Sequence, residues 1–104
     1  MVPEDIGKLF TNRGASGSVT FTLPIVGDIQ SGWWVEVFAA AAQNVVVASW
    51  NSLDNITTFN DLTADSITFS TSSEIVGAGV RLVWDGTGWL AFLMTEETQT
   101  TTIA

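Results

Sequence analysis

The residues that could do chemistry in this chain are its carboxylates, because the side chains that usually catalyse reactions near neutral pH are missing. The 104 residues contain no histidine, no cysteine and no tyrosine, which removes the common general bases, nucleophiles and metal ligands. A pair of carboxylic acids can still hydrolyse a glycosidic bond. By residue type alone, the candidates for such a pair are Asp54, Asp61, Asp65 and Glu74. A polar loop of solvated acids explains these residues equally well, so we expect no enzyme activity.

The same polar stretch offers oxygen ligands of the kind that Ca²⁺ binds, but their spacing differs from that of the EF-hand calcium loop. The acids and amides at positions 54, 55, 60, 61 and 65 do not follow the pattern Asp-Xaa-Asp-Xaa-Asp-Gly. Asparagine and aspartate side chains more often hold turns together. We therefore expect no bound metal and no cofactor.

The charge of the chain is sparse and strongly acidic, with eleven Asp and Glu against three Lys and Arg and a formal net charge of −8. An acidic surface repels phosphate groups, so we expect no nucleic-acid partner and no binding to anionic membranes. Positions 4 and 5 are acidic where a signal peptide would be positive, and no long apolar run follows them. We therefore expect the chain to be made in the cytoplasm.

The elements that must position these residues are short strands, because apolar and polar side chains alternate along much of the chain. The predicted strands lie at 8–12, 18–23, 33–39, 45–50, 56–59, 66–70, 80–84 and 89–94. Seven or eight short strands without a clear helix indicate an all-β protein: a small antiparallel β-sandwich, a jelly roll or a barrel. We expect an N-terminal arm at 1–8, a single β-domain at 9–94, and a C-terminal arm or tail at 95–104.

The last two of these strands form the clearest local feature, a predicted hairpin around Asp85-Gly86-Thr87-Gly88. This run lacks the Gly-Lys-Ser/Thr ending of a phosphate-binding loop and precedes a strand, so we interpret it as a turn. Gly86 or Gly88 should adopt a positive φ. We expect Trp84 and Trp89 to fix the register of the hairpin, with Trp89 in the core.

The apolar content is high for so few charges, with five tryptophans and six phenylalanines in a chain that is 46% hydrophobic. This predicts a subunit with a large protein–protein interface, although a well-filled monomeric core would also explain it. Trp33 and Trp34 are adjacent, so in a strand they must face opposite sides. The candidate interface residues are Trp34, Phe38, Trp84 and Trp89. We expect a homo-oligomer, either a dimer or a trimer.

Two segments of the chain also resemble known proteins. The run Gly14-Ala-Ser-Gly-Ser-Val-Thr-Phe-Thr-Leu-Pro24 and the later run Val80-Arg-Leu-Val-Trp-Asp-Gly-Thr-Gly-Trp89 are similar to small β-modules in virion proteins of tailed bacteriophages. Such modules occur in capsid decoration (cement) proteins and in tail-fibre or spike proteins. The likeness covers mainly residues 10–24 and 75–92. The chain departs from the usual pattern in the tryptophan-rich stretch 33–50 and in the acidic stretch 51–65.

The resemblance implies a structural protein of the phage virion. A capsid decoration protein would be made in the host cytoplasm, would bind the major capsid protein on the outer capsid surface, and would stabilise contacts between capsomers. The alternative is a receptor- or glycan-binding module of a tail fibre or spike. Because tail-fibre modules are usually parts of longer chains, a chain of 104 residues favours the decoration protein.

Overall fold

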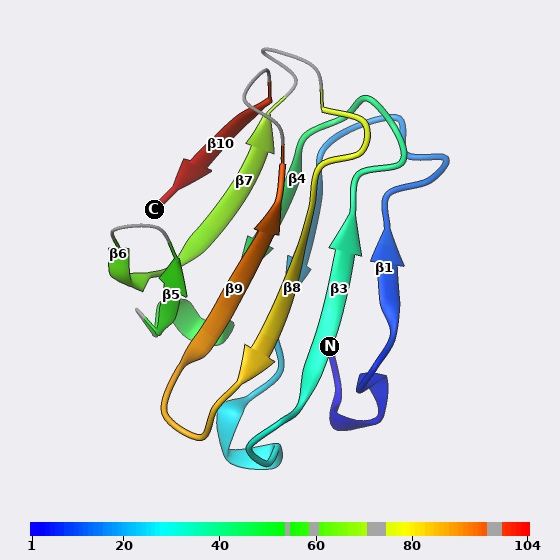
Figure 1. Ribbon diagram of the computed structural model, residues 1–104. Helices are drawn as coiled ribbons and strands as arrows, with labels where there is room; N and C mark the ends of the chain where they lie inside the picture. Colours follow the sequence, from blue (N-terminus) through cyan, green and yellow to red (C-terminus); the bar gives the residue numbers. More distant parts are fainter. Residues whose placement is uncertain (54, 59–60, 71–74, 96–98) are drawn as a thin grey trace.

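A computed structural model describes residues 1–53, 55–58, 61–70, 75–95 and 99–104, and the regular secondary structure of these residues is mostly β-strand (Figure 1). The strands are β1 Leu9–Thr11, β2 Val19–Thr22, β3 Trp34–Phe38, β4 Val45–Ala48, β5 Ile56–Thr58, β6 Asp61–Ala64, β7 Ser66–Ser70, β8 Gly79–Trp84, β9 Trp89–Met94 and β10 Thr100–Ile103. Three short 3-10 turns, η1 Pro3–Asp5, η2 Val26–Asp28 and η3 Trp50–Ser52, lie between strands or before the first one. Among the described residues, no helix is long and apolar enough to cross a membrane.

The strands form two separate sheets. One has six strands in the order β1-β3-β8-β9-β5-β6, and the other has four in the order β10-β7-β4-β2. The expectation of antiparallel sheets is wrong, because β1 pairs with β3, β2 with β4, and β5 with β9 in parallel. The first four strands alternate between the two sheets: β1 and β3 belong to one sheet, and β2 and β4 to the other. Because the chain reverses direction at each step, the two strands of each pair run in the same direction. The expected barrel is also wrong, since neither sheet closes.

The two sheets share one hydrophobic core, to which the strands contribute every second residue. Val35 and Val37 on β3, and Val80 and Leu82 on β8, are completely buried. The four-stranded sheet contributes Val45 and Val47 from β4 and Ile67 and Phe69 from β7. The predicted alternation over 33–39 is confirmed, because Trp33, Val35, Val37 and Ala39 are all buried.

Both ends of the chain differ from the arms that the sequence predicts. At the start, residues 3–5 form η1 instead of an extended arm, and the amino group of Met1 donates to the carbonyl of Thr22 at 2.8 Å. At the end, β10 pairs with β7 of the same chain as an edge strand. A threonine-rich run has no apolar face, but its backbone can still add to a sheet edge.

The predicted hairpin between β8 and β9 is confirmed, with Trp84 paired to Trp89. Gly86 has φ +95°, a conformation that favours glycine. The carboxylate of Asp85 accepts hydrogen bonds from the backbone N–H groups of Gly88 and Thr87, both at 2.8 Å. These two bonds stabilise the charged form and lower the pKa of Asp85 from its ordinary value of 3.8.

Candidate functional site

The side of the six-stranded sheet that points away from the core is a mainly apolar surface, which we call the outer face. It is formed by alternate residues of β1, β3, β8 and β9, the four neighbouring strands at one side of this sheet (Figure 1). Its members are Leu9, Thr11, Trp34, Glu36, Phe38, Arg81, Val83, Leu90, Phe92 and Met94. The residues between them point into the core, so the outer face follows from strand alternation.

Four large apolar side chains of the outer face are exposed to solvent. Leu9 is 59% exposed, Phe92 55%, Met94 47% and Phe38 38%. Trp34, Val83 and Leu90 lie among them and are half-buried. Monomeric soluble proteins rarely leave so many neighbouring apolar side chains in water unless the surface binds something.

One ion pair lies at the centre of the outer face. Glu36 and Arg81 are register partners on β3 and β8, and Arg81 Nη2 lies 3.3 Å from Glu36 Oε2. The guanidinium group also lies 5.1 Å from the centroid of the Trp34 ring, within the range of a cation–π interaction. Among the described residues of the outer face, these two are the charged ones, so the face as a whole is neutral.

A groove of about 490 Å³ runs over the outer face beside this ion pair. Its walls are the side chains of Arg81, Val83, Phe92 and Met94. Three of the four are apolar, and the fourth carries a positive charge. The groove is therefore suited to an apolar side chain that has a carboxylate near it.

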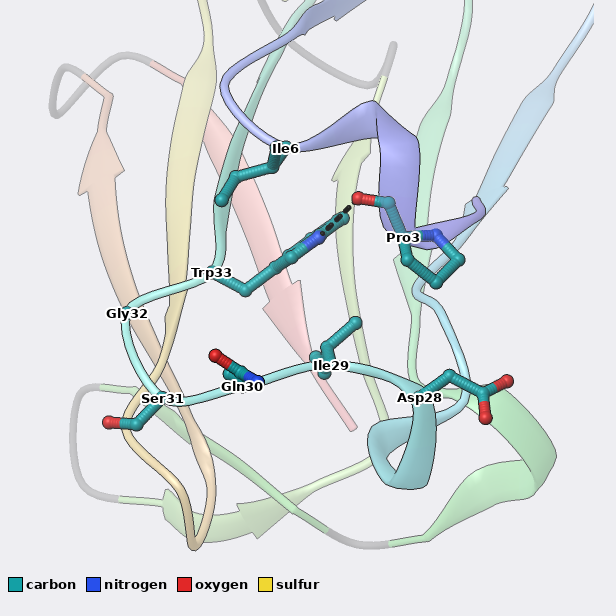
Figure 2. Close-up of a pocket in the computed structure, with 8 residues that line it drawn as sticks. All are labelled: Pro3, Ile6, Asp28, Ile29, Gln30, Ser31, Gly32 and Trp33. Atoms are coloured by element: carbon teal, nitrogen blue, oxygen red, sulfur yellow. Dashed lines mark hydrogen bonds between the residues drawn. The ribbon is translucent and has the colours of Figure 1, made fainter.

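A second pocket, of about 420 Å³, lies at one end of the molecule around Trp33 (Figure 2). Trp33 is only 4% exposed, and its Nε1 donates a hydrogen bond to the carbonyl of Pro3 at 2.8 Å. Figure 2 shows Ile6 and Ile29 on either side of the ring, whereas the polar ends of Asp28 and Ser31 point away from it. The pocket therefore offers little open aromatic surface on which a sugar could stack.

The structure separates the four candidate interface residues. Trp34 and Phe38 lie on the outer face, but Trp84 is 7% exposed and Trp89 completely buried. The ring centroids of Trp84 and Trp33 lie 5.4 Å and 5.6 Å from that of Trp89. The predicted core position of Trp89 is confirmed, and its inclusion among the candidate interface residues is wrong because it is completely buried. The expected surface position of Trp84 is wrong, because it shares the inner side of β8 with Val80 and Leu82.

Sequence reasoning missed most of the outer face. Leu9, Glu36, Arg81, Phe92 and Met94 were not among the predicted interface residues. The alternation of 89–94 already places Phe92 and Met94 on the side opposite Trp89. The position of Arg81 beside Glu36, in contrast, depends on the pairing of β3 with β8.

Of the carboxylates considered for catalysis, the structure describes Asp61 and Asp65. Asp61 lies in β6 and its Oδ1 accepts a hydrogen bond from the N–H of Thr63 at 2.9 Å, so it holds the local backbone. Asp65 lies between β6 and β7. Asp54 and Glu74 are outside the described residues. Within the described part of the chain, no group of three or more acidic, histidine or cysteine side chains could hold a metal ion.

Comparison of this chain with models of known protein families, with curated proteins and with solved structures finds no match. The resemblance to phage virion modules stays a prediction from the two sequence segments at 10–24 and 75–92. The outer face is the structural feature from which a function can be inferred.

Proposed function

We propose that this protein is a non-catalytic structural protein of a phage virion, namely a capsid decoration (cement) protein. It binds the major capsid protein on the outer capsid surface and stabilises the contacts between capsomers. The observation that supports an association role is the outer face, where Leu9, Phe38, Phe92 and Met94 are all exposed. A protein that binds an assembled shell, and not its separated subunits, stabilises the shell by mass action.

The composition of the chain supports the same proposal. The absence of histidine and cysteine suits a protein that works by binding rather than by chemistry. A net charge of −8 keeps such a protein soluble and away from nucleic acid during assembly. We also propose that the two sheets, which share one core, form a β-sandwich and that the protein acts as a homo-oligomer, a dimer or a trimer.

The test is the location of the protein in virions assembled with a tagged copy of this chain. Gold particles directed to the tag should appear on the heads, as seen by negative-stain electron microscopy. Gold on the tails alone would contradict the decoration role and would support the receptor- or glycan-binding module of a tail fibre or spike. Gold on neither would contradict both.

A further inference from the structure

We infer that a second copy of this chain covers the outer face, in a symmetric dimer whose twofold axis runs parallel to the strands between β3 and β8. The inference rests on the homo-oligomer proposed above and names the surface through which two copies of the chain bind each other. Its geometry follows from the register of four strands and from the positions of two charges.

Two copies of this acidic chain can meet on the outer face without charge repulsion. The chain has a net charge of −8, yet the charges that the structure describes on the outer face are one acid, Glu36, and one base, Arg81. A twofold interface uses the same surface on both subunits, so this surface must be complementary to itself. A neutral apolar surface with one charge of each sign meets that requirement.

The relative orientation of the two copies follows from these charges. Because Glu36 and Arg81 are register partners on adjacent strands, a twofold axis parallel to the strands and midway between them exchanges their positions. Glu36 of the second copy then faces Arg81 of the first, and the reverse contact occurs on the other side of the axis. A twofold axis across the strands at this register position would instead place Glu36 on Glu36 and Arg81 on Arg81, which is unfavourable.

The same axis brings apolar residues together. One row of register partners across the sheet reads Leu9, Glu36, Arg81 and Phe92. Exchange of its two ends places Leu9 of the second copy over Phe92, where the groove of about 490 Å³ lies. In the next row, Trp34 and Val83 are register partners and meet in the same way.

The size of the outer face sets the strength of this dimer. Four strands about 4.8 Å apart and five residues of about 3.3 Å each cover roughly 300 Å² in flat projection, and the protruding side chains add to this. A standard stable interface buries about 800 Å² per partner. We therefore expect a dimer in equilibrium with monomer at micromolar concentrations, rather than a permanent one.

The test is the dimer dissociation constant, measured by sedimentation equilibrium for wild type and for charge-reversed variants. Arg81→Glu and Glu36→Arg should each weaken the dimer about a hundredfold or more, because like charges then face each other. The double variant E36R/R81E exchanges the two charges and should dimerise about as well as wild type. Thr20→Glu, on the exposed side of β2 in the other sheet, should leave the dissociation constant unchanged.

Three results would overturn the inference: a wild-type protein that is monomeric up to about 1 mM, single variants that dimerise like wild type, or a double variant as weak as the single ones. Circular dichroism of each variant shows that it is folded.

If the protein is monomeric in solution but gold labels the heads, the dimer is wrong and the decoration role stands. If it dimerises as described but does not occur on virions, the decoration role is wrong and the dimer stands.

Discussion

Trp84 and Trp89 are register partners at the end of the β8–β9 hairpin, and their ring centroids lie 5.4 Å apart at an interplanar angle of 57°. The ring centroid of Trp33 lies 5.6 Å from that of Trp89, in an edge-to-face arrangement. Since aromatic pairs in these geometries add stability beyond the area that they bury, the three rings tie the hairpin to the start of β3.

Replacing Trp89 by alanine should therefore lower the free energy of unfolding by about 3–5 kcal/mol. That is a large part of the roughly 5–15 kcal/mol expected for a domain of this kind. Urea denaturation followed by circular dichroism measures the loss. Trp50→Ala removes the same side chain where it is 41% exposed, and should cost clearly less. Equal effects of the two substitutions would show that Trp89 is not a core anchor.

Asn12 holds the chain at the turn after β3. This side chain is 3% exposed, and its Oδ1 accepts hydrogen bonds from the N–H groups of Ala40 and Ala41 at 2.7 and 2.9 Å. Asn12→Ala leaves both donors without a partner and should cost about 2–4 kcal/mol of unfolding free energy. Gln30→Ala, at an exposed position, is the control and should be nearly neutral. An Asn12→Ala protein as stable as wild type would rule out this role.

Gly79 has no room for a side chain. A Cβ atom built there would lie 2.9 Å from the carbonyl oxygen of Val37 and 3.4 Å from Met94 Cε. Gly79→Ala should therefore lower the unfolding free energy by about 1–3 kcal/mol, since the contact with the Val37 carbonyl oxygen is too short and the backbone must shift. Gly27→Ala meets nothing within 4 Å and should leave the melting temperature close to that of wild type. Equal melting temperatures for the Gly79→Ala and Gly27→Ala proteins would contradict this expectation.

The hairpin turn should make part of the stability depend on pH. Because hydrogen bonds from Gly88 and Thr87 lower the pKa of Asp85 in the folded protein, its carboxylate stabilises the fold above the pKa of the unfolded chain. This contribution is lost as the pH falls from about 4 through the lower folded pKa. Asp85→Asn keeps an acceptor oxygen but does not titrate. Its melting temperature should fall less than that of wild type between pH 5 and pH 2, and parallel profiles would contradict the assignment.

Local alternation made much of the strand content predictable, but not the way in which the strands meet. The pattern around Val35 and Val37 identified β3 and its buried side, and the turn at Gly86 identified the last hairpin. The threonine-rich β10 has no apolar period, so its place at the sheet edge could not be predicted. The parallel pairs β1–β3 and β2–β4 follow from alternation of the chain between two sheets, which is a tertiary property. For the same reason the sequence suggested Trp34 and Phe38 as interface residues but not the Glu36–Arg81 pair.

The most direct test of the central claim, that a second copy covers the outer face, uses the absence of cysteine from the chain. In the proposed dimer Leu9 of one copy lies over Phe92 of the other, whereas the two copies of Leu9 are offset sideways by three strand spacings, about 14 Å, in addition to the gap between the two sheets. A short bifunctional maleimide, which joins two thiols across a gap too wide for a disulfide, should therefore link a mixture of Leu9→Cys and Phe92→Cys chains into a dimer much faster than it links Leu9→Cys chains alone. Equal rates for the mixture and for the Leu9→Cys chains alone, or no cross-link in either, would contradict the account.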